Sequence, residues 1–500
     1  MSDDSSQSLV SKAGRGVLWL TLAKFYFMGT GFLLLVFLPA MFTKLSGDVD
    51  GSLYGRFRVV IGLINLLNMI LIGGALQAVS KFISEKETRA RAVKWQALRI
   101  QIVLGGVISV GLFTSADYIA QRFYGQPELA FYLRLASPIV LLYACYAVII
   151  GCLNGLKRFF HQALMDVLFA SSKVGLTILL VAGGFAIAGA IGGFLATAVS
   201  MLLIATLVLG RLPAGDDFSW RTILAFEWKT LLYALGLNIV LQLDLQLLMA
   251  LAPPEFGSAE SQTGIYGLAL QMGQLPYIAT IAVAFVVFPL VSRSTFDNDA
   301  RQTKTYVVTT NRFLFVALAG IVAALSTTGN GIMSLPFFPD FYASGSQIFS
   351  VLTVGYLFFA IIVVNTNILT GSGRPLTSVA LLASTTSLAA LFNLYAIPRY
   401  GGIGAAAATS AAMGCGYIAT FLVCRRRFGA FISPLTLGRS ALGATVVVLY
   451  HHYLEPSPTG LVSVLLSLIV KSVLYFAVLV ALRELTRTDL HQVLLLRRRK

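Results

Sequence analysis

Charged residues are scarce in this chain of 500 residues. Asp, Glu, Lys and Arg together make up 12% of it, whereas 57% of the residues are hydrophobic. A water-soluble protein of this length could not cover its surface with so few charged side chains. The composition therefore excludes a soluble protein and predicts one whose surface lies mostly in lipid.

Residue types that carry catalysis or bind metals are also few. The four cysteines and four histidines show no metal-ligand spacing, and no Gly-x-Ser-x-Gly or His-Glu-x-x-His motif occurs. We therefore predict a protein that is not an enzyme. We expect no catalytic residue, no metal site and no cofactor beyond a coupling ion, H+ or Na+.

Long hydrophobic runs, in contrast, recur through the whole chain. A helix needs roughly 20 apolar residues to cross about 30 Å of hydrocarbon, and the sequence contains about fourteen runs of that length. They leave only short loops, so we predict an all-α polytopic membrane protein. The expected spans are residues 16–40, 58–80, 98–116, 132–153, 164–186, 190–210, 230–252, 265–290, 306–327, 347–369, 376–397, 402–424, 436–454 and 460–482.

Basic residues are distributed unevenly over the expected loops. Of the 37 Lys and Arg residues, 28 fall on the side that holds the N-terminus, 6 on the other side and 3 within spans. Because loops rich in Lys and Arg stay in the cytoplasm, both termini are predicted to be cytoplasmic. The same bias explains the net charge of +16 without a nucleic-acid partner.

The second six spans resemble the first six. Four motif pairs recur in the same order, at offsets of 212 to 216 residues: Leu-Tyr-Gly at 53–55 with Ile-Tyr-Gly at 265–267, Val-Ser-Lys at 79–81 with Val-Ser-Arg at 291–293, Leu-Asn-Gly at 153–155 with Leu-Thr-Gly at 369–371, and Ala-Ile-Gly-Gly at 190–193 with Gly-Ile-Gly-Ala at 402–405. The shared order and near-constant offset indicate a duplication.

The repeat predicts how the chain is organised. Six spans per copy is an even number, so both copies enter the membrane in the same direction and are related by a pseudo-twofold axis along the membrane normal. We therefore expect two six-helix lobes around a central cavity, residues 12–229 and 230–430. A helix pair at 431–490 follows outside the repeat.

These motifs also resemble a known family. Together with Asn154-Gly155, Gly371-Ser-Gly373-Arg374 and Tyr400-Gly-Gly-Ile-Gly404, they resemble the polysaccharide biosynthesis flippases of the multidrug/oligosaccharidyl-lipid/polysaccharide exporter superfamily. The resemblance implies a transporter that flips a polyprenyl-diphosphate-linked oligosaccharide across the bacterial inner membrane by alternating access. It implies membrane lipids and the lipid-linked substrate as partners, a glycan polymerase as a further one, and a lipid-tail groove formed by spans 13 and 14.

Two other functions remain open. The first is a multidrug or organic-cation antiporter of the same superfamily, which would depend on Asp244 more than on Lys24. The second is a membrane-embedded glycosyltransferase or polymerase, because such enzymes often bind a metal with an acidic pair in an outer loop. Asp48 and Asp50 form such a pair in the first outer loop.

Ionisable side chains within the spans are the candidate site residues. Each costs roughly 2.5–3.5 kcal/mol at the bilayer centre, so it normally faces a cavity or a partner. A diphosphate carries at least two negative charges, and Lys or Arg in a cavity of low dielectric constant would attract it. The candidates are Lys24 in span 1, Asp166 and Lys173 in span 5, Asp244 in span 7, and Arg58 at the outer start of span 2.

Lys24 is the predicted ligand of the diphosphate. Asp244 occupies the equivalent position of the second lobe at an offset of 220 residues, so we hypothesise that the two face each other across the cavity. Asp166 and Lys173 lie seven residues apart on one face of a helix. Each of these groups could instead form an ion pair that serves folding alone. Lys471 in span 14 could hold a lipid phosphate or snorkel.

Overall fold

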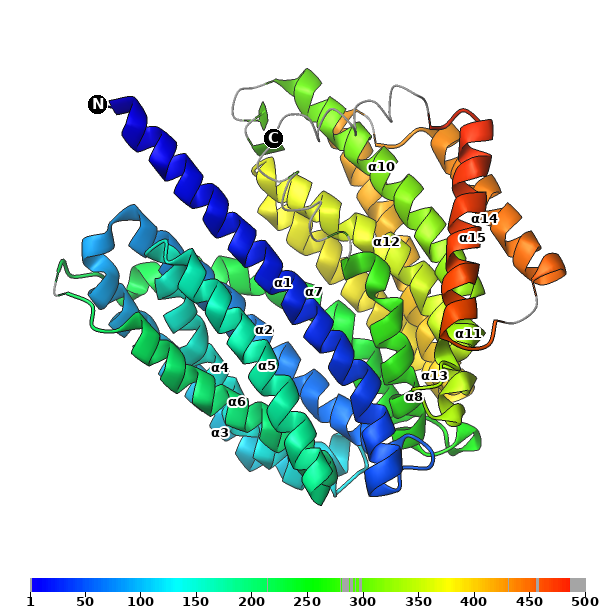
Figure 1. The fold of residues 1–500 in the computed structure, drawn as a ribbon, viewed down its shortest axis with the longest axis horizontal. Helices are drawn as coiled ribbons and strands as arrows, with labels where there is room; N and C mark the ends of the chain where they lie inside the picture. The colour runs from blue at the N-terminus through cyan, green and yellow to red at the C-terminus, as the bar shows by residue number, and fades with distance from the viewer. Residues whose placement is uncertain are drawn as a thin grey trace. The chain divides into compact units, whose positions relative to one another are not determined.

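The computed structural model describes residues 2–485, apart from 214, 279, 281–286, 288–290, 293, 296–298, 430, 456 and 457. Every regular element in this part of the chain is a helix (Figure 1). The second half of the expected span at 265–290 lies largely outside the described residues. By their contacts, the helices form two units, Met1–Gly264 and Ile265–Lys500.

The first unit contains seven long helices and the start of an eighth. Its elements are α1 (Ser2–Ser46), α2 (Ser52–Glu85), η1 (Glu87–Arg89), α3 (Ala90–Tyr118), η2 (Ile119–Phe123), α4 (Leu129–Gly155), α5 (Phe159–Leu180), η3 (Val181–Phe185), α6 (Ala186–Leu209), α7 (Trp220–Leu251), η4 (Pro254–Phe256) and the first residues of α8 (Ala259–Gly273). Here α2 packs against α4 and α7, and α1 runs along α5.

The second unit contains the rest of α8 and the helices that follow it. These are α10 (Ala300–Thr327), α11 (Gly329–Met333), η5 (Asp340–Gly345), α12 (Ser346–Gly371), α13 (Pro375–Phe428), α14 (Pro434–Leu454) and α15 (Leu461–Ala481). Within this unit α12 packs mainly against α13 and α10, and α10 also contacts both α14 and α15.

Ten helical segments among the described residues are long and apolar enough to cross a membrane. The all-α, multi-pass prediction is therefore confirmed, while the count of fourteen spans stays a prediction. Two of the ten segments are longer than one crossing requires, Phe159–Leu209 with 51 residues and Pro375–Phe428 with 54. Each contains a break near its middle.

The long helix α13 is a hairpin of two helices. Gly401 has φ 55° and interrupts the helix, a left-handed conformation that glycine adopts with little penalty. Asn393 Nδ2 donates to Thr409 Oγ1 over 3.0 Å, whereas residues sixteen apart in a straight helix would be separated by about 24 Å. The two halves therefore run back along each other, as the expected spans 376–397 and 402–424 require.

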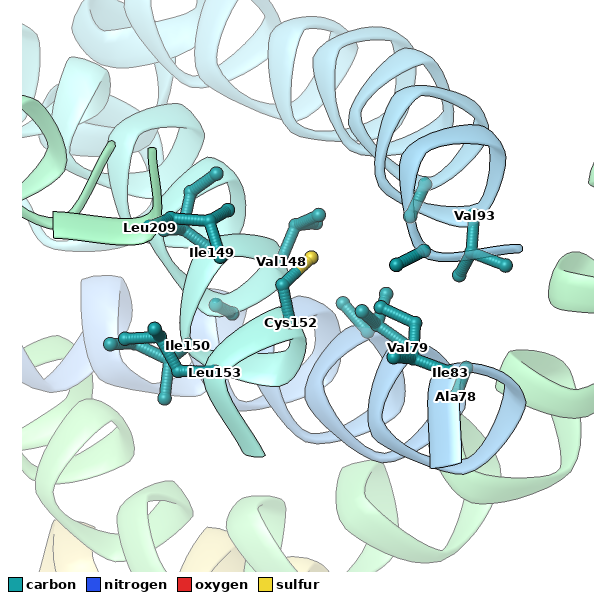
Figure 2. Packing of buried hydrophobic residues seen from close by; sticks show 14 of the residues in the cluster. Ala78, Val79, Ile83, Val93, Val148, Ile149, Ile150, Cys152, Leu153 and Leu209 are labelled. Carbon is teal, nitrogen blue, oxygen red and sulfur yellow. The ribbon is translucent and has the colours of Figure 1, made fainter. Parts of the chain in front are cut away.

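The repeated motifs meet in the packing of each unit. In the first unit, Val79 of α2 and Leu153 of α4 belong to one buried apolar cluster (Figure 2). Ser80 Oγ donates to Asn154 Oδ1 over 2.7 Å in the same contact. In the second unit the equivalent residues, Val291 and Leu369, share a buried cluster as well. The motifs thus recur because the same contact between spans two apart is built twice.

A glycine makes this contact close. A Cβ atom at Gly155 would lie 2.8 Å from Ile83 Cβ and 2.9 Å from the carbonyl oxygen of Ser80. Only glycine allows the end of α4 to approach α2 this closely without displacement. This explains the Asn154-Gly155 motif as a packing feature of the fold.

The C-terminal helix pair is fastened to α10 at its middle and at both ends. Tyr475 of α15 is fully buried, and its ring lies against Gly320 of α10 and Gly443 of α14. Toward one end, Lys471 reaches from the middle of α15, and its Nζ lies 2.6 Å from Glu455 Oε2 at the end of α14 and donates to Thr328 Oγ1 at the end of α10 over 2.8 Å. Lys471 is therefore a fully buried ion-pair partner, and the interpretation that it snorkels is wrong.

The other end of the pair is held by Glu484. Its carboxylate lies 2.9 Å from Arg312 Nε of α10 and 2.9 Å from Arg439 of α14, and accepts a hydrogen bond from Thr436. Burial alone raises the pKa of Glu484, but the hydrogen bonds from Arg312, Arg439 and Thr436 outweigh it and hold the pKa below its usual 4.5. The ionised carboxylate thus stabilises the junction of three helices.

This junction predicts a pH-dependent stability. A carboxylate whose pKa is lowered by folding contributes its full stability above the pKa of the unfolded chain and loses it as the pH falls through the folded value. We expect Glu484→Gln to lower the thermal midpoint of the detergent-solubilised protein at pH 7. The difference from wild type should shrink below about pH 4.5. Glu85→Gln, at an exposed carboxylate, is the control, and a difference that did not change with pH would contradict the assignment.

Candidate functional site

All five predicted site residues lie in the first unit. Lys24 is on α1, Arg58 on α2, Asp166 and Lys173 on α5, and Asp244 on α7. The predicted lobe boundary at residues 229 and 230 separates Asp244 from the other four. The division by contacts, at Gly264, groups all five, because α7 packs against α2 and α3.

The contact between α1 and α5 contains an ion pair. Lys24 Nζ lies 2.9 Å from Asp166 Oδ2. The two side chains differ in exposure, 62% for Lys24 and 14% for Asp166. Two residues farther along α1 and five farther along α5, Tyr26 and Ser171 share a hydrogen bond of 2.8 Å between their hydroxyl groups. Lys24 and Tyr26 of α1 are therefore each bonded to α5 while a large part of each side chain stays exposed.

Lys173 is held by aromatic rings. Its Nζ lies 5.0 Å from the centroid of Phe27 on α1 and 5.5 Å from that of Phe194 on α6. An ammonium group over a ring face gains about 0.5–2 kcal/mol, more where water is excluded. Lys173 thus places a second positive charge two turns along α5 from Asp166. The rings of Phe27 and Phe194, rather than a carboxylate, hold its ammonium group.

The polar residues of α7 face α2. Gln246 Nε2 donates to the carbonyl oxygen of Val59 over 3.2 Å, and the Tyr124 hydroxyl donates to Gln246 Oε1. A Cβ atom at Gly62 would lie within 3.0 Å of both Gln242 and Gln246. These amides join α7 to α2 within the unit, so they serve packing.

Asp244 is buried within the first unit. Only 1% of its surface is exposed, and its Oδ1 accepts from the backbone N–H of Leu245 over 2.8 Å. The ion pair that the structure shows for Lys24 is with Asp166. The hypothesis that Lys24 and Asp244 face each other therefore stays a prediction.

Arg56, near the start of α2, lies in an ionic cluster. Arg56 pairs with Glu128 at the start of α4, and its Nη2 lies 3.4 Å from Glu260 at the start of α8. Arg58 lies two residues farther along α2 and interacts electrostatically with Tyr54. The sequence did not predict the carboxylates that pair with Arg56, because Glu128 and Glu260 lie outside the expected spans. Acidic residues directly before a span were the available signal.

The acidic pair in the first outer loop begins a helix. The carboxylate of Asp48 accepts from the backbone N–H groups of Leu53 and Tyr54, each over 3.3 Å, and Asp50 accepts from the N–H of Ser52. Side chains that satisfy the free N–H groups of a first turn stabilise a helix. No group of three or more His, Cys, Asp or Glu able to hold a metal occurs among the described residues. This geometry does not favour the transferase alternative.

Comparison with known proteins decides the family. The model of a family described as "Polysaccharide biosynthesis protein" matches residues 13–295, more than half of the chain. The chain belongs to the polysaccharide biosynthesis protein family. The match covers every predicted site residue, from Lys24 to Asp244, and so places the candidate site inside the part of the chain that the family shares.

Relatives of this polysaccharide biosynthesis protein are membrane proteins. It is 23% identical over 398 residues to the uncharacterized membrane protein YabM of Bacillus subtilis (strain 168), across 74% of this chain and 73% of YabM. Its structure is similar to that of the lipid II flippase MurJ in an inward closed conformation, with a TM-score of 0.74, 16% identity, and coverage of 94% of this chain and 99% of MurJ.

A multidrug transporter shares the fold as well. The structure is similar to that of an inward-facing multidrug resistance MATE family transporter of the MOP superfamily, with a TM-score of 0.63 and 17% identity over 79% of this chain and 94% of the transporter. At these identities the likeness to MurJ and to the MATE transporter shows a common fold. It leaves the cargo to be argued from the site.

The exposure of Lys24 predicts its accessibility to water. We expect Lys24→Cys, in a chain whose one exposed cysteine is replaced by Cys415→Ser, to react with a membrane-impermeant thiol reagent applied to both faces of the membrane. Val107→Cys, on the exposed apolar surface of α3, should not react because lipid covers it. Labelling is measured by mass shift. An unreactive cysteine at position 24 would show that Lys24 faces lipid.

Proposed function

We propose that this protein flips a polyprenyl-diphosphate-linked oligosaccharide across the bacterial inner membrane, for the synthesis of a surface polysaccharide. The family supports a role in polysaccharide biosynthesis, and the fold supports a flippase that works by alternating access. The observation that carries the proposal is the exposed ammonium group of Lys24, anchored by Asp166 on a membrane helix.

The ion pair gives Lys24 two possible partners. The pair is open on the side of Lys24, which is 62% exposed, whereas Asp166 is 14% exposed. A pair open to water contributes only about 0–1 kcal/mol to stability, so its cation can bind another anion at little cost. The diphosphate of the substrate offers charge-assisted hydrogen bonds that are roughly twice as strong as neutral ones. Binding thus replaces Asp166 by the diphosphate, and release restores the original pair.

The net charge of the site suits a diphosphate. Lys24, Lys173 and Arg58 contribute three positive charges, and Asp166 and Asp244 contribute two negative charges, which leaves a net charge of +1. The three cations lie on three different helices, α1, α5 and α2. A few single cations attract a dianion without binding it so tightly that it fails to leave, which is what a transport cycle requires.

A drug or organic-cation antiporter is the second candidate. The likeness to a MATE family transporter favours it, as does the buried carboxylate of Asp244, which would attract a cation. Under this alternative Lys24 would repel the cargo. Either transporter would use a coupling ion, H+ or Na+. The glycan flippase would deliver its product to a polymerase on the outer face. Both termini of the chain would lie in the cytoplasm.

Lipid analysis in cells tests the proposal. Depleting the protein should cause a polyprenyl-diphosphate-linked oligosaccharide to accumulate, detectable by mass spectrometry of lipid extracts. Lys24→Ala should fail to reverse the accumulation, because it removes a charged hydrogen bond of about 1.5–3 kcal/mol, a factor of ten or more in binding.

Matched variants separate the role of charge from that of folding. Lys24→Arg keeps the positive charge and should restore export, whereas Lys81→Ala, at an exposed lysine beyond the α1–α5 contact, should behave as wild type. If no lipid-linked oligosaccharide accumulates and depleted cells become sensitive to cationic drugs instead, the antiporter replaces the flippase.

A further inference from the structure

A groove opens between α3 and α7 at their predicted cytoplasmic ends. Its volume is about 350 Å³, and its lining residues are Gln96, Arg99, Ile100, Val103, Leu104, Trp220 and Leu224. Both helices begin on the same predicted side of the membrane, so they run in the same direction here. One end of the groove, its entrance, therefore lies toward the first residues of both helices, and the other end lies deeper in the membrane.

The groove is polar at its entrance and apolar deeper in the membrane. Gln96 and Arg99 on α3 and Trp220 on α7 come first along their helices, at the entrance. Val103 and Leu104 come one turn deeper on α3, and Leu224 one turn deeper on α7. A Trp at the interface with an apolar stretch beneath it is the usual arrangement at the boundary between headgroups and acyl chains.

Two cations in or beside the entrance have no carboxylate partner in the described part of the chain. Arg99 lines the groove and is exposed on α3. Arg221 lies beside the groove, exposed on α7, with its guanidinium carbon 5.7 Å from the ring centroid of the lining residue Trp220. Two of the three neighbouring acidic residues are engaged elsewhere, and the third, Asp217, is exposed. Asp216 pairs with Lys86, and the buried Glu227 accepts from Gln101 over 3.3 Å, where α3 and α7 come together.

We propose that this groove binds an anionic phospholipid of the bilayer. Its phosphate would lie between Arg99 and Arg221, and one acyl chain would extend over Val103, Leu104 and Leu224. Charge complementarity selects an anionic over a zwitterionic headgroup. The volume is at the small end of the range for ligand sites, about 300–1,000 Å³, and suits one acyl chain better than a long branched polyprenyl chain.

The bound lipid would brace the start of α7 against α3. The two helices contact each other directly through the Gln101–Glu227 hydrogen bond. The lipid would fill the groove that remains between them. The site lies on helices other than α1 and α5, which carry Lys24 and Asp166. Occupancy by lipid is therefore independent of the proposed transport cargo.

Native mass spectrometry of the full-length protein in detergent tests the site. Phosphatidylglycerol should be retained in preference to phosphatidylethanolamine. Arg99→Gln and Arg221→Gln should each weaken retention of phosphatidylglycerol about fivefold, which corresponds to about 1 kcal/mol per basic residue near an anionic headgroup. Val103→Trp should abolish retention because the indole fills the groove.

Two control variants match these changes. Val107→Trp lies one turn along α3 on its exposed apolar surface, outside the groove, and Arg426→Gln removes an exposed basic residue elsewhere. Both should retain phosphatidylglycerol as wild type does, and size-exclusion chromatography shows that each variant is folded. Equal retention of the two lipids, or undiminished retention by Val103→Trp, would overturn the proposal. Retention of a polyprenyl lipid in place of phosphatidylglycerol, lost in the same variants, would overturn the identity of the occupant.

Discussion

Three lysines that this fold places on membrane helices are each held by a partner, as the cost of a charge in hydrocarbon requires. Lys24 pairs with Asp166, Lys173 lies over aromatic rings, and Lys471 pairs with Glu455. The three partnerships differ in one respect that matters for function, which is exposure. Lys471 is fully buried, whereas Lys24 keeps most of its surface free.

These partners also show which features of the site the sequence could predict and which it could not. Hydrophobic periodicity located Lys24, Asp166 and Lys173 in spans 1 and 5, because the pattern depends only on neighbours along the chain. It could not show that α1 packs on α5, so it did not predict the Lys24–Asp166 pair and indicated only Asp244, at the equivalent position of the repeat. Which helices touch depends on the shapes of whole faces, and no local pattern reports that.

The repeat was the most informative part of the sequence for the fold. Val79 with Leu153, and Val291 with Leu369, were visible as motifs, and the structure shows that they are the contact points of equivalent helices. The hairpin at Gly401 agrees with the two expected spans at 376–397 and 402–424. The acidic pair at Asp48 shows the opposite case, since a metal-binding pattern of three residues is also a common way to begin a helix.

A direct measurement of lipid flipping tests the central claim, that the cation of Lys24 carries the substrate diphosphate. Purified protein would be reconstituted into liposomes with a fluorescent polyprenyl-diphosphate oligosaccharide, and the fraction of sugar reached by an added glycosidase would be followed over time. The account predicts that wild type and Lys24→Arg expose the inner-leaflet sugar, and that Lys24→Ala, equally folded and reconstituted, does not. Flipping by Lys24→Ala at the wild-type rate would contradict it.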